Sequence, residues 1–163
     1  MIAHALGIDR LMPRAGYVMA EWPHDETRIV DHVIGAFYLI RRDAFERLGG
    51  FDERFFVYLE DVDLSMRVRA AGGKSMYVTN ATAHHAGGGT TRSIAATRLF
   101  YSVRSRLQYA AKHLGAPSIA AVWGLSLTVE PLLRTIGALW HRSGTELAQV
   151  WSAYAQLFRW IVR

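Results

Sequence analysis

The chain has 163 residues, 51% of them hydrophobic, which is enough for one domain with a substantial core. Its formal net charge of +5 implies affinity for anions, such as nucleic acid, phosphate-bearing lipids or a nucleotide sugar. It contains no cysteine, which excludes a disulfide framework and a thiolate metal site.

The first 29 residues predict no regular element, because Pro13, Gly16 and Pro23 interrupt them. The stretch from Met1 to Arg10 lacks the charged lead and the long apolar centre of a secretory signal. We therefore expect no export.

From Val30 to Arg42 the sequence is an apolar run that predicts a β-strand. Gly35 interrupts this run, and a residue without a side chain allows another backbone or a ligand to come close. Asp43 is expected to cap a short helix, Ala44 to Leu48. The glycine pair Gly49-Gly50 should end that helix.

Three phenylalanines follow the glycine pair and are expected to be buried as scaffold: Phe51, Phe55 and Phe56. Next come three acids, Glu60, Asp61 and Asp63, which open a pattern of helical spacing that Gly72 ends. Carboxylates on the first turn of a helix can accept hydrogen bonds from its free N–H groups. Capping explains one or two of these acids. A third acid after a dense aromatic run favours the rim of a ligand-binding cleft.

A second strand is predicted from Lys74 to Thr79, which is rich in β-forming residues. Beyond it, His84 and His85 stand before three glycines and the sequence Thr90-Thr91-Arg92. Imidazole, free backbone N–H groups and a cation together suit a diphosphate and its metal. A flexible glycine loop with incidental histidines is the alternative.

A basic amphipathic helix is predicted between Thr97 and Gly115. The tail, Ser118 to Arg163, predicts two more helices, broken at Arg142-Ser143-Gly144. Its tryptophans are typical of a membrane-interface segment, although core packing explains them equally well. We expect no membrane-spanning helix, because charged residues and Pro131 interrupt the most apolar region.

Several ordered motifs together carry a family resemblance. They are Gly35-Ala36, Arg41-Arg42, Gly49-Gly50-Phe51-Asp52-Glu53, Phe55-Phe56, Glu60-Asp61-Val62-Asp63-Leu64 and His84-His85-Ala86-Gly87-Gly88-Gly89-Thr90. This stretch, about Val30 to Gly115, closely resembles the C-terminal half of bacterial family 2 glycosyltransferases, and the rhamnosyltransferase-like branch is nearest.

The resemblance implies an α/β fold: a partial GT-A-like mixed sheet with helices, followed by an α-helical tail. We expect residues 1–115 to form the acceptor-side half of the family domain and residues 116–163 to form the helical tail. The donor half of the family, with its Asp-X-Asp motif, has no counterpart here, so the sequence looks like half of an enzyme or a truncated gene product. Exposed sheet edges would then be covered by the tail, by self-association or by a partner chain that carries the donor half.

By resemblance the activity is inverting transfer of a sugar from a nucleotide-sugar donor to a cell-envelope glycan or lipid-linked acceptor. Asp61 would be the catalytic base with Glu60 as its catalytic neighbour, and His85 would approach a divalent metal, Mg or Mn. The residues expected to bind substrate are Gly35, Ala36, Asp63, Gly88, Thr90 and Arg92.

The implied location is the cytoplasm, peripheral on an anionic inner membrane face. A non-catalytic binding or membrane-surface module is the alternative function. Nucleic-acid binding is not favoured, because the basic residues are spread out and form no recognised motif.

Overall fold

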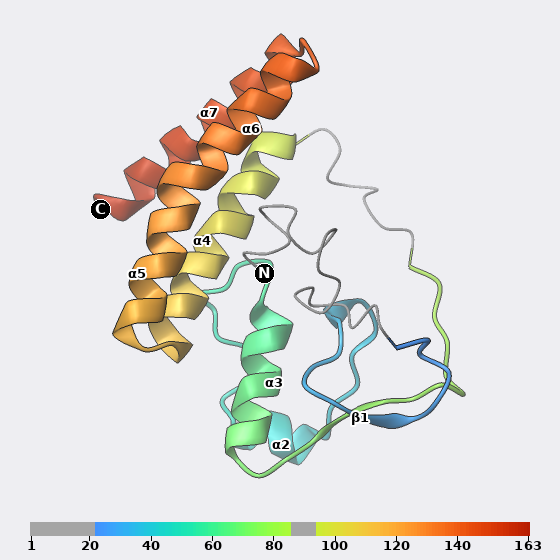
Figure 1. The fold of residues 1–163 in the computed structure, drawn as a ribbon. Coiled ribbons are helices and arrows are strands. Elements are labelled where there is room, and N and C mark those ends of the chain that lie inside the picture. Colours follow the sequence, from blue (N-terminus) through green and yellow to red (C-terminus); the bar gives the residue numbers. More distant parts are fainter. Residues whose placement is uncertain (1–21, 86–93) are drawn as a thin grey trace. The chain divides into compact units, whose positions relative to one another are not determined.

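A computed structural model describes residues 22–85 and 94–163 (Figure 1). These residues divide into two compact units. The sheet unit has residues 23–85 as its described part, and the helical unit has Trp22 and residues 94–163.

The sheet unit contains a two-stranded antiparallel sheet. Strand β1 (Arg28–Val30) pairs with strand β2 (Ser75–Tyr77), and Arg28 lies opposite Tyr77. Strand β2 confirms the strand predicted after Lys74. The prediction of a mixed sheet is wrong for the described residues, because these two short strands are all the sheet they form and they run antiparallel.

The long strand predicted from Val30 to Arg42 is also wrong. Strand β1 ends at Val30, and a 3-10 turn, η3 (Gly35–Phe37), follows it. A strand needs a neighbour to complete its hydrogen-bond ladder, and residues 31–42 pair with no strand in the described part of the chain. The amide of Gly35 donates instead to the carboxylate of Asp61.

Helix α2 (Arg42–Arg47) begins two residues earlier than predicted. Asp43 therefore lies inside the first turn and does not cap the helix; its carboxylate accepts a 2.8 Å hydrogen bond from Arg47. Gly49 and Gly50 follow the helix with φ of 74° and 72°, a left-handed backbone that glycine adopts without strain. The predicted end of the helix at this glycine pair is confirmed.

Helix α3 (Glu60–Ala70) confirms the predicted acidic helix. Phe55, just before it, is 4% exposed, as expected for scaffold. The burial predicted for Phe51 and Phe56 is wrong, since they are 45% and 72% exposed. Phe51 packs edge-on against Phe45 at the surface, with ring centroids 5.4 Å apart, and so gains aromatic contact without full burial.

The helical unit contains the long helix α4 (Ala95–His113) and helix α7 (Gly144–Ile161), which pack together (Figure 1). Their core consists of Val103, Leu107, Val150, Tyr154 and Leu157. Both helices were predicted, and so was the break before α7, where Ser143 caps the helix by accepting a hydrogen bond from the amide of Glu146. The two compact units divide before α4. The boundary predicted after residue 115 is the end of the family domain, which this division does not test, so it stays a prediction.

Between α4 and α7 the chain forms one continuous helix from Ala116 to Trp140. It comprises α5 (Ala116–Gly124), the π-helical turn η5 (Leu125–Val129) and α6 (Glu130–Trp140). Pro131 does not break it, because the π turn shifts the hydrogen-bond register and places the proline in the first turn of α6, where its missing N–H is tolerated. By length and composition alone, this helix could cross a membrane, which corrects the expectation that no stretch would qualify.

The sequence left two interpretations open for the tryptophans of the tail, core packing and a membrane interface, and the structure has tryptophans of both kinds of exposure. Trp123 and Trp160 pack against the helical core, whereas Trp140 and Trp151 are 86% and 50% exposed. Helix α4, the predicted basic helix, does not expose all of its arginines to solvent. Arg106 is buried, and the guanidinium of Arg104 lies 5.4 Å from the ring centroid of Trp160.

Candidate active site

The acidic helix is entered through an unusual backbone turn. Tyr58 and Leu59 have φ of 67° and 69°, so two consecutive residues other than glycine adopt the left-handed conformation. Each such residue costs on the order of 1–3 kcal/mol and persists only where the surrounding structure imposes it. Leu59 is the N-cap of α3 and provides no side-chain hydrogen bond to it. The strained turn therefore places the acids that follow without the usual polar cap.

Asp61 is held by two backbone amides from different parts of the chain. Its Oδ2 accepts a 2.7 Å hydrogen bond from the amide of Gly35, and its Oδ1 accepts a 2.8 Å hydrogen bond from the amide of Val62. A Cβ atom added at Gly35 would lie only 3.2 Å from Oδ2. Gly35 thus allows a close approach, but the approaching group is the side-chain carboxylate of Asp61 and not the backbone or ligand that the sequence predicted. The substrate-binding role of Gly35 stays a prediction.

Glu60 lies beside Asp61 in a different environment. It is half-buried, and its Oε2 is buried without a hydrogen-bond partner among the described residues. Loss of solvation raises the pKa of the Glu60 carboxyl, and the neighbouring charge of Asp61 adds to that rise. Two adjacent carboxyls therefore differ chemically: Asp61 accepts two N–H bonds, and Glu60 holds its proton to a higher pH than an exposed glutamate.

Asp63 is fully buried and has a local structural partner. It accepts a 2.8 Å hydrogen bond from Nε of Arg67. The two Nη groups of Arg67 donate 2.8 Å bonds to the carbonyls of Leu48 and Gly50. This network joins α3 to the turn after α2. The substrate-binding role predicted for Asp63 stays a prediction, and the described contacts of this residue are those of a fold-stabilising ion pair.

The other predicted site residues are less constrained by the structure. Ala36 lies exposed in η3, one residue beyond the Asp61 contact, and His85 is exposed at the end of the described part of the sheet unit. Gly88, Thr90 and Arg92 lie outside the described residues.

The metal expected beside His85 has no ligand set in the described ranges. Residues 22–85 and 94–163 bring no three His, Asp or Glu side chains close enough to hold a metal ion. These residues alone do not fit a metal, and the role of His85 stays a prediction.

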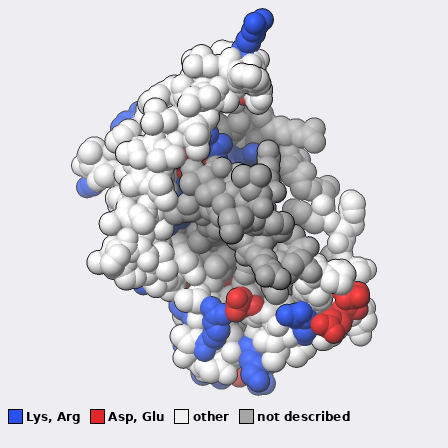
Figure 2. All heavy atoms as spheres, in the orientation of Figure 1, with Lys and Arg blue, Asp and Glu red and all other residues white. Residues whose placement is uncertain are grey.

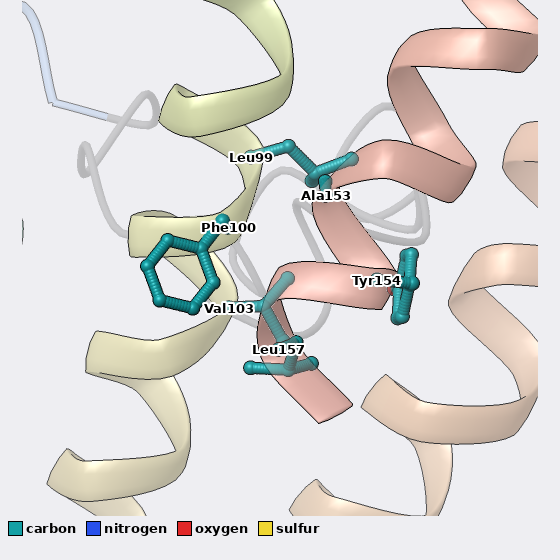
Figure 3. Close-up of a pocket in the computed structure, with 6 residues that line it drawn as sticks. All are labelled: Leu99, Phe100, Val103, Ala153, Tyr154 and Leu157. Atoms are coloured by element: carbon teal, nitrogen blue, oxygen red, sulfur yellow. The ribbon is translucent and has the colours of Figure 1, made fainter. Parts of the chain in front are cut away.

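The helical unit has a small surface depression (Figure 3). Its lining consists of Leu99, Phe100 and Val103 from α4 and of Ala153, Tyr154 and Leu157 from α7. It has no room for a water molecule and an almost wholly apolar lining. We interpret it as imperfect packing between two helices.

Two features of the site could not be read from the sequence. The left-handed turn at Tyr58 and Leu59 has no glycine or asparagine to indicate it. The amide of Val62 acts through its backbone, which no residue type reveals. Gly35 did carry a signal, since a glycine within an apolar run indicates a close approach.

Comparison with known proteins connects this geometry to a family. The model of "Glycosyl transferase family group 2" matches residues 17–162. The N-acetylglucosaminyl-diphospho-decaprenol L-rhamnosyltransferase of Mycobacterium tuberculosis is 40% identical over 89 residues, which are 54% of this chain and 29% of that protein. Rhamnosyltransferase WbbL of Escherichia coli K12 is 34% identical over 84 residues, which are 52% of this chain and 32% of that protein.

A third relative, the O-antigen biosynthesis protein RfbC of Myxococcus xanthus, is 45% identical over 58 residues, which are 35% of this chain and 4% of that protein. The aligned part of the chain thus spans about a third or less of these curated relatives. No solved structure matches the chain. Because the family model covers most of the sequence, including the acidic helix, the chain belongs to the group 2 family of glycosyl transferases and is rhamnosyltransferase-like.

Proposed function

We propose that this chain provides the acceptor-side part of an inverting glycosyltransferase with a GT-A-like fold. The acceptor hydroxyl oxygen attacks the anomeric carbon of a nucleotide sugar. A new C–O bond forms as the bond from that carbon to the diphosphate breaks, and the nucleoside diphosphate leaves. The acceptor proton must go to a base at the same time. Inversion needs only one such base, positioned opposite the leaving group.

Asp61 is the proposed base, and its two amide contacts carry the proposal. A base has to be ionised and correctly oriented. Hydrogen bonds from backbone N–H groups fix the plane of a carboxylate. The amides of Gly35 and Val62 do this at 2.7 and 2.8 Å, and each carboxylate oxygen keeps a lone pair for the acceptor proton.

Glu60 is proposed as the neighbour that keeps a proton. Its raised pKa and its unpartnered Oε2 suit a carboxylic acid that donates a hydrogen bond to the acceptor sugar. The two adjacent acids would then have different roles, since Asp61 removes a proton and Glu60 orients the hydroxyl group.

The substrate class is proposed from the relatives. Two of them are rhamnosyltransferases by name, and one of these names a diphospho-decaprenol acceptor. We infer a nucleotide-linked deoxyhexose donor and a lipid-linked or cell-envelope glycan acceptor for this chain. We propose that Ala36, one residue beyond the Asp61 contact, contacts the acceptor. Binding of the donor would need the Asp-X-Asp half of the family, in the same polypeptide or in a partner chain.

His85 is proposed to contact a divalent ion, Mg or Mn, or the leaving diphosphate. It is exposed, and in the sequence it stands directly before the glycine run and Thr90-Thr91-Arg92. His85→Ala should then weaken metal-dependent binding of the donor, measured by calorimetry on the complete enzyme. His84→Ala is the matched control, because it removes the adjacent exposed imidazole. Equal effects of the two variants would remove the special role of His85.

The Asp61→Asn variant tests the base. Asparagine keeps one acceptor oxygen and loses the other, so about 1 kcal/mol of stability should be lost with one hydrogen bond. Turnover should fall by roughly two or more orders of magnitude, the scale for loss of a general base, while donor binding persists. The assay uses the chain together with a donor-binding half. A folded variant that turns over like the wild type would leave Asp61 as a capping residue and favour a non-catalytic binding module.

A further inference from the structure

The continuous helix Ala116–Trp140 exposes a mostly apolar face, on which Arg134 is the one exposed charged residue of the helix. Its exposed positions recur every three or four residues and include Pro117, Ala120, Ala121, Gly124, Thr128, Leu132, Leu133, Ile136, Leu139 and Trp140. Leu132, Ile136 and Leu139 are 59–61% exposed. At a rise of 1.5 Å per residue, the 25 residues extend about 37 Å. In Figure 2 the region of α5 and α6 is mostly uncharged surface.

Two polar residues of this helix, Ser126 and Glu130, are buried inside the helical unit. Glu130 is 2% exposed and pairs with two arginines, Arg106 of α4 and Arg134 one turn further along α6. Tyr154 of α7 donates a 3.0 Å hydrogen bond to the carbonyl of Ser126, which is also buried. A helix on a water-soluble domain normally turns its apolar side inward and its charges outward. This helix departs from that pattern on its exposed side, which is mostly apolar, while its glutamate is buried beside apolar residues that pack on the core.

Two polar side chains at exposed positions of this helix already bond within the helix. The hydroxyl of Thr128 donates to the carbonyl of Gly124 at 2.7 Å, within the helix itself. The guanidinium of Arg134 is turned to Glu130, with Nη2 at 2.8 Å from Oε1. Protein interfaces carry a polar rim and about one hydrogen bond per 100–200 Å². Lipid chains need no such bonds and require charges to be paired inside.

Helix α7, which packs against α6, adds a second stripe of the same kind. Its exposed positions include Ala148, Trp151, Ala155, Phe158 and Val162. At the turn between the two helices, Trp140 is followed by His141 and Arg142. An exposed tryptophan beside a basic residue is the usual anchor at the boundary between lipid and water.

We propose that the exposed face of the helix Ala116–Trp140 inserts into a lipid bilayer and lies in the plane of the membrane interface. The in-plane orientation follows from the packing, since the opposite side of the helix contacts α4 and α7 and holds the buried ion pairs. The attachment rests on apolar burial, so it differs from purely electrostatic binding of the basic helix. It does not depend on the sugar-transfer proposal.

Flotation with vesicles of phosphatidylcholine and phosphatidylglycerol tests the insertion. The wild-type chain should float with the vesicles and remain bound in about 1 M salt, where electrostatic attachment is screened within about 3 Å. The double variant Ile136→Gln, Leu139→Gln keeps the net charge and removes two exposed apolar side chains. Its bound fraction at fixed lipid should fall at least tenfold. Release of the wild type by salt would overturn the proposal.

The matched control changes two exposed apolar residues of the sheet unit, Leu39→Gln and Met76→Gln, and should leave flotation unchanged.

A second measurement needs no destabilising variant: brominated phospholipids should quench tryptophan fluorescence, and Trp140→Phe should reduce that quenching. Absence of quenching in the wild type would overturn the proposal. A soluble dimer that becomes monomeric in the Ile136, Leu139 variant would also overturn it, because the face would then bind a second copy.

Discussion

The amide of Gly35 donates a 2.7 Å hydrogen bond to Oδ2 of Asp61, and this bond joins two residues 26 positions apart in the sequence. It connects the turn η3 to the first turn of α3. The space for the bond exists because Gly35 has no side chain, since a Cβ atom there would lie 3.2 Å from the same oxygen. The orientation of the proposed base thus depends on a glycine that carries no chemistry of its own.

Gly35→Ala should therefore misplace Asp61 without unfolding the protein. The new methyl group would push the carboxylate by a few tenths of an ångström, and small displacements of a catalytic group can cost up to about a hundredfold in rate. We expect kcat to fall roughly tenfold to a hundredfold in the complete enzyme, with donor affinity unchanged. Gly124→Ala is the control, because a Cβ there meets nothing within 4 Å. An unchanged kcat would show that Gly35 does not position Asp61 for catalysis.

Glu60→Gln should change how stability depends on pH. Burial raises the pKa of Glu60 in the folded state, so the native protein binds its proton more tightly than the unfolded chain does. The stability gained from this tighter proton binding is complete below the ordinary glutamate pKa of 4.5. It is lost as pH rises through the pKa of Glu60 in the folded state. The variant should thus be more stable than the wild type at neutral pH, and the difference should vanish toward pH 4. Thermal unfolding across this range measures it, with the exposed Glu53→Gln as control.

Arg67→Met should destabilise the sheet unit strongly. The substitution removes the bonds to the carbonyls of Leu48 and Gly50 and leaves the fully buried Asp63 without its arginine. Breaking a buried ion pair from one side costs about 3–5 kcal/mol. Urea unfolding followed by circular dichroism should show this loss. Arg47→Met is the control, because its ion pair with Asp43 is exposed and worth at most about 1 kcal/mol.

The buried ion pair of the helical unit should behave differently when both partners change. Glu130→Leu alone leaves Arg106 buried and unpaired, so it should destabilise by about 3–5 kcal/mol. Adding Arg106→Met removes the unpaired charge and should restore most of the loss. Denaturant unfolding of the two single variants and the double variant gives the coupling energy. A double variant as unstable as the sum of the two singles would show that the pair is not coupled.

Local patterns in the sequence determined much of the secondary structure. The spacing of apolar residues predicted α3, α4 and the two helices of the tail, and the glycines after α2 and α3 marked where those helices end. The acids on the first turn of α3 were found the same way. These features depend on residues a few positions apart, so a linear reading detects them.

Tertiary contacts decided the rest. The run after Val30 forms no strand in the described part of the chain, because a strand requires a partner that lies elsewhere in the sequence, and Gly35 finds a carboxylate instead. The role of each acid also depends on distant groups: Asp63 meets Arg67 bound to the turn after α2, whereas Asp61 meets Gly35. Glu130 and Pro131 were predicted to interrupt the most apolar region, but a π turn precedes the proline and Arg106 of α4 pairs with Glu130 inside the helical unit. Sequence spacing reveals which side chains share a helix, but burial and long-range hydrogen bonds determine which of them remain available for chemistry.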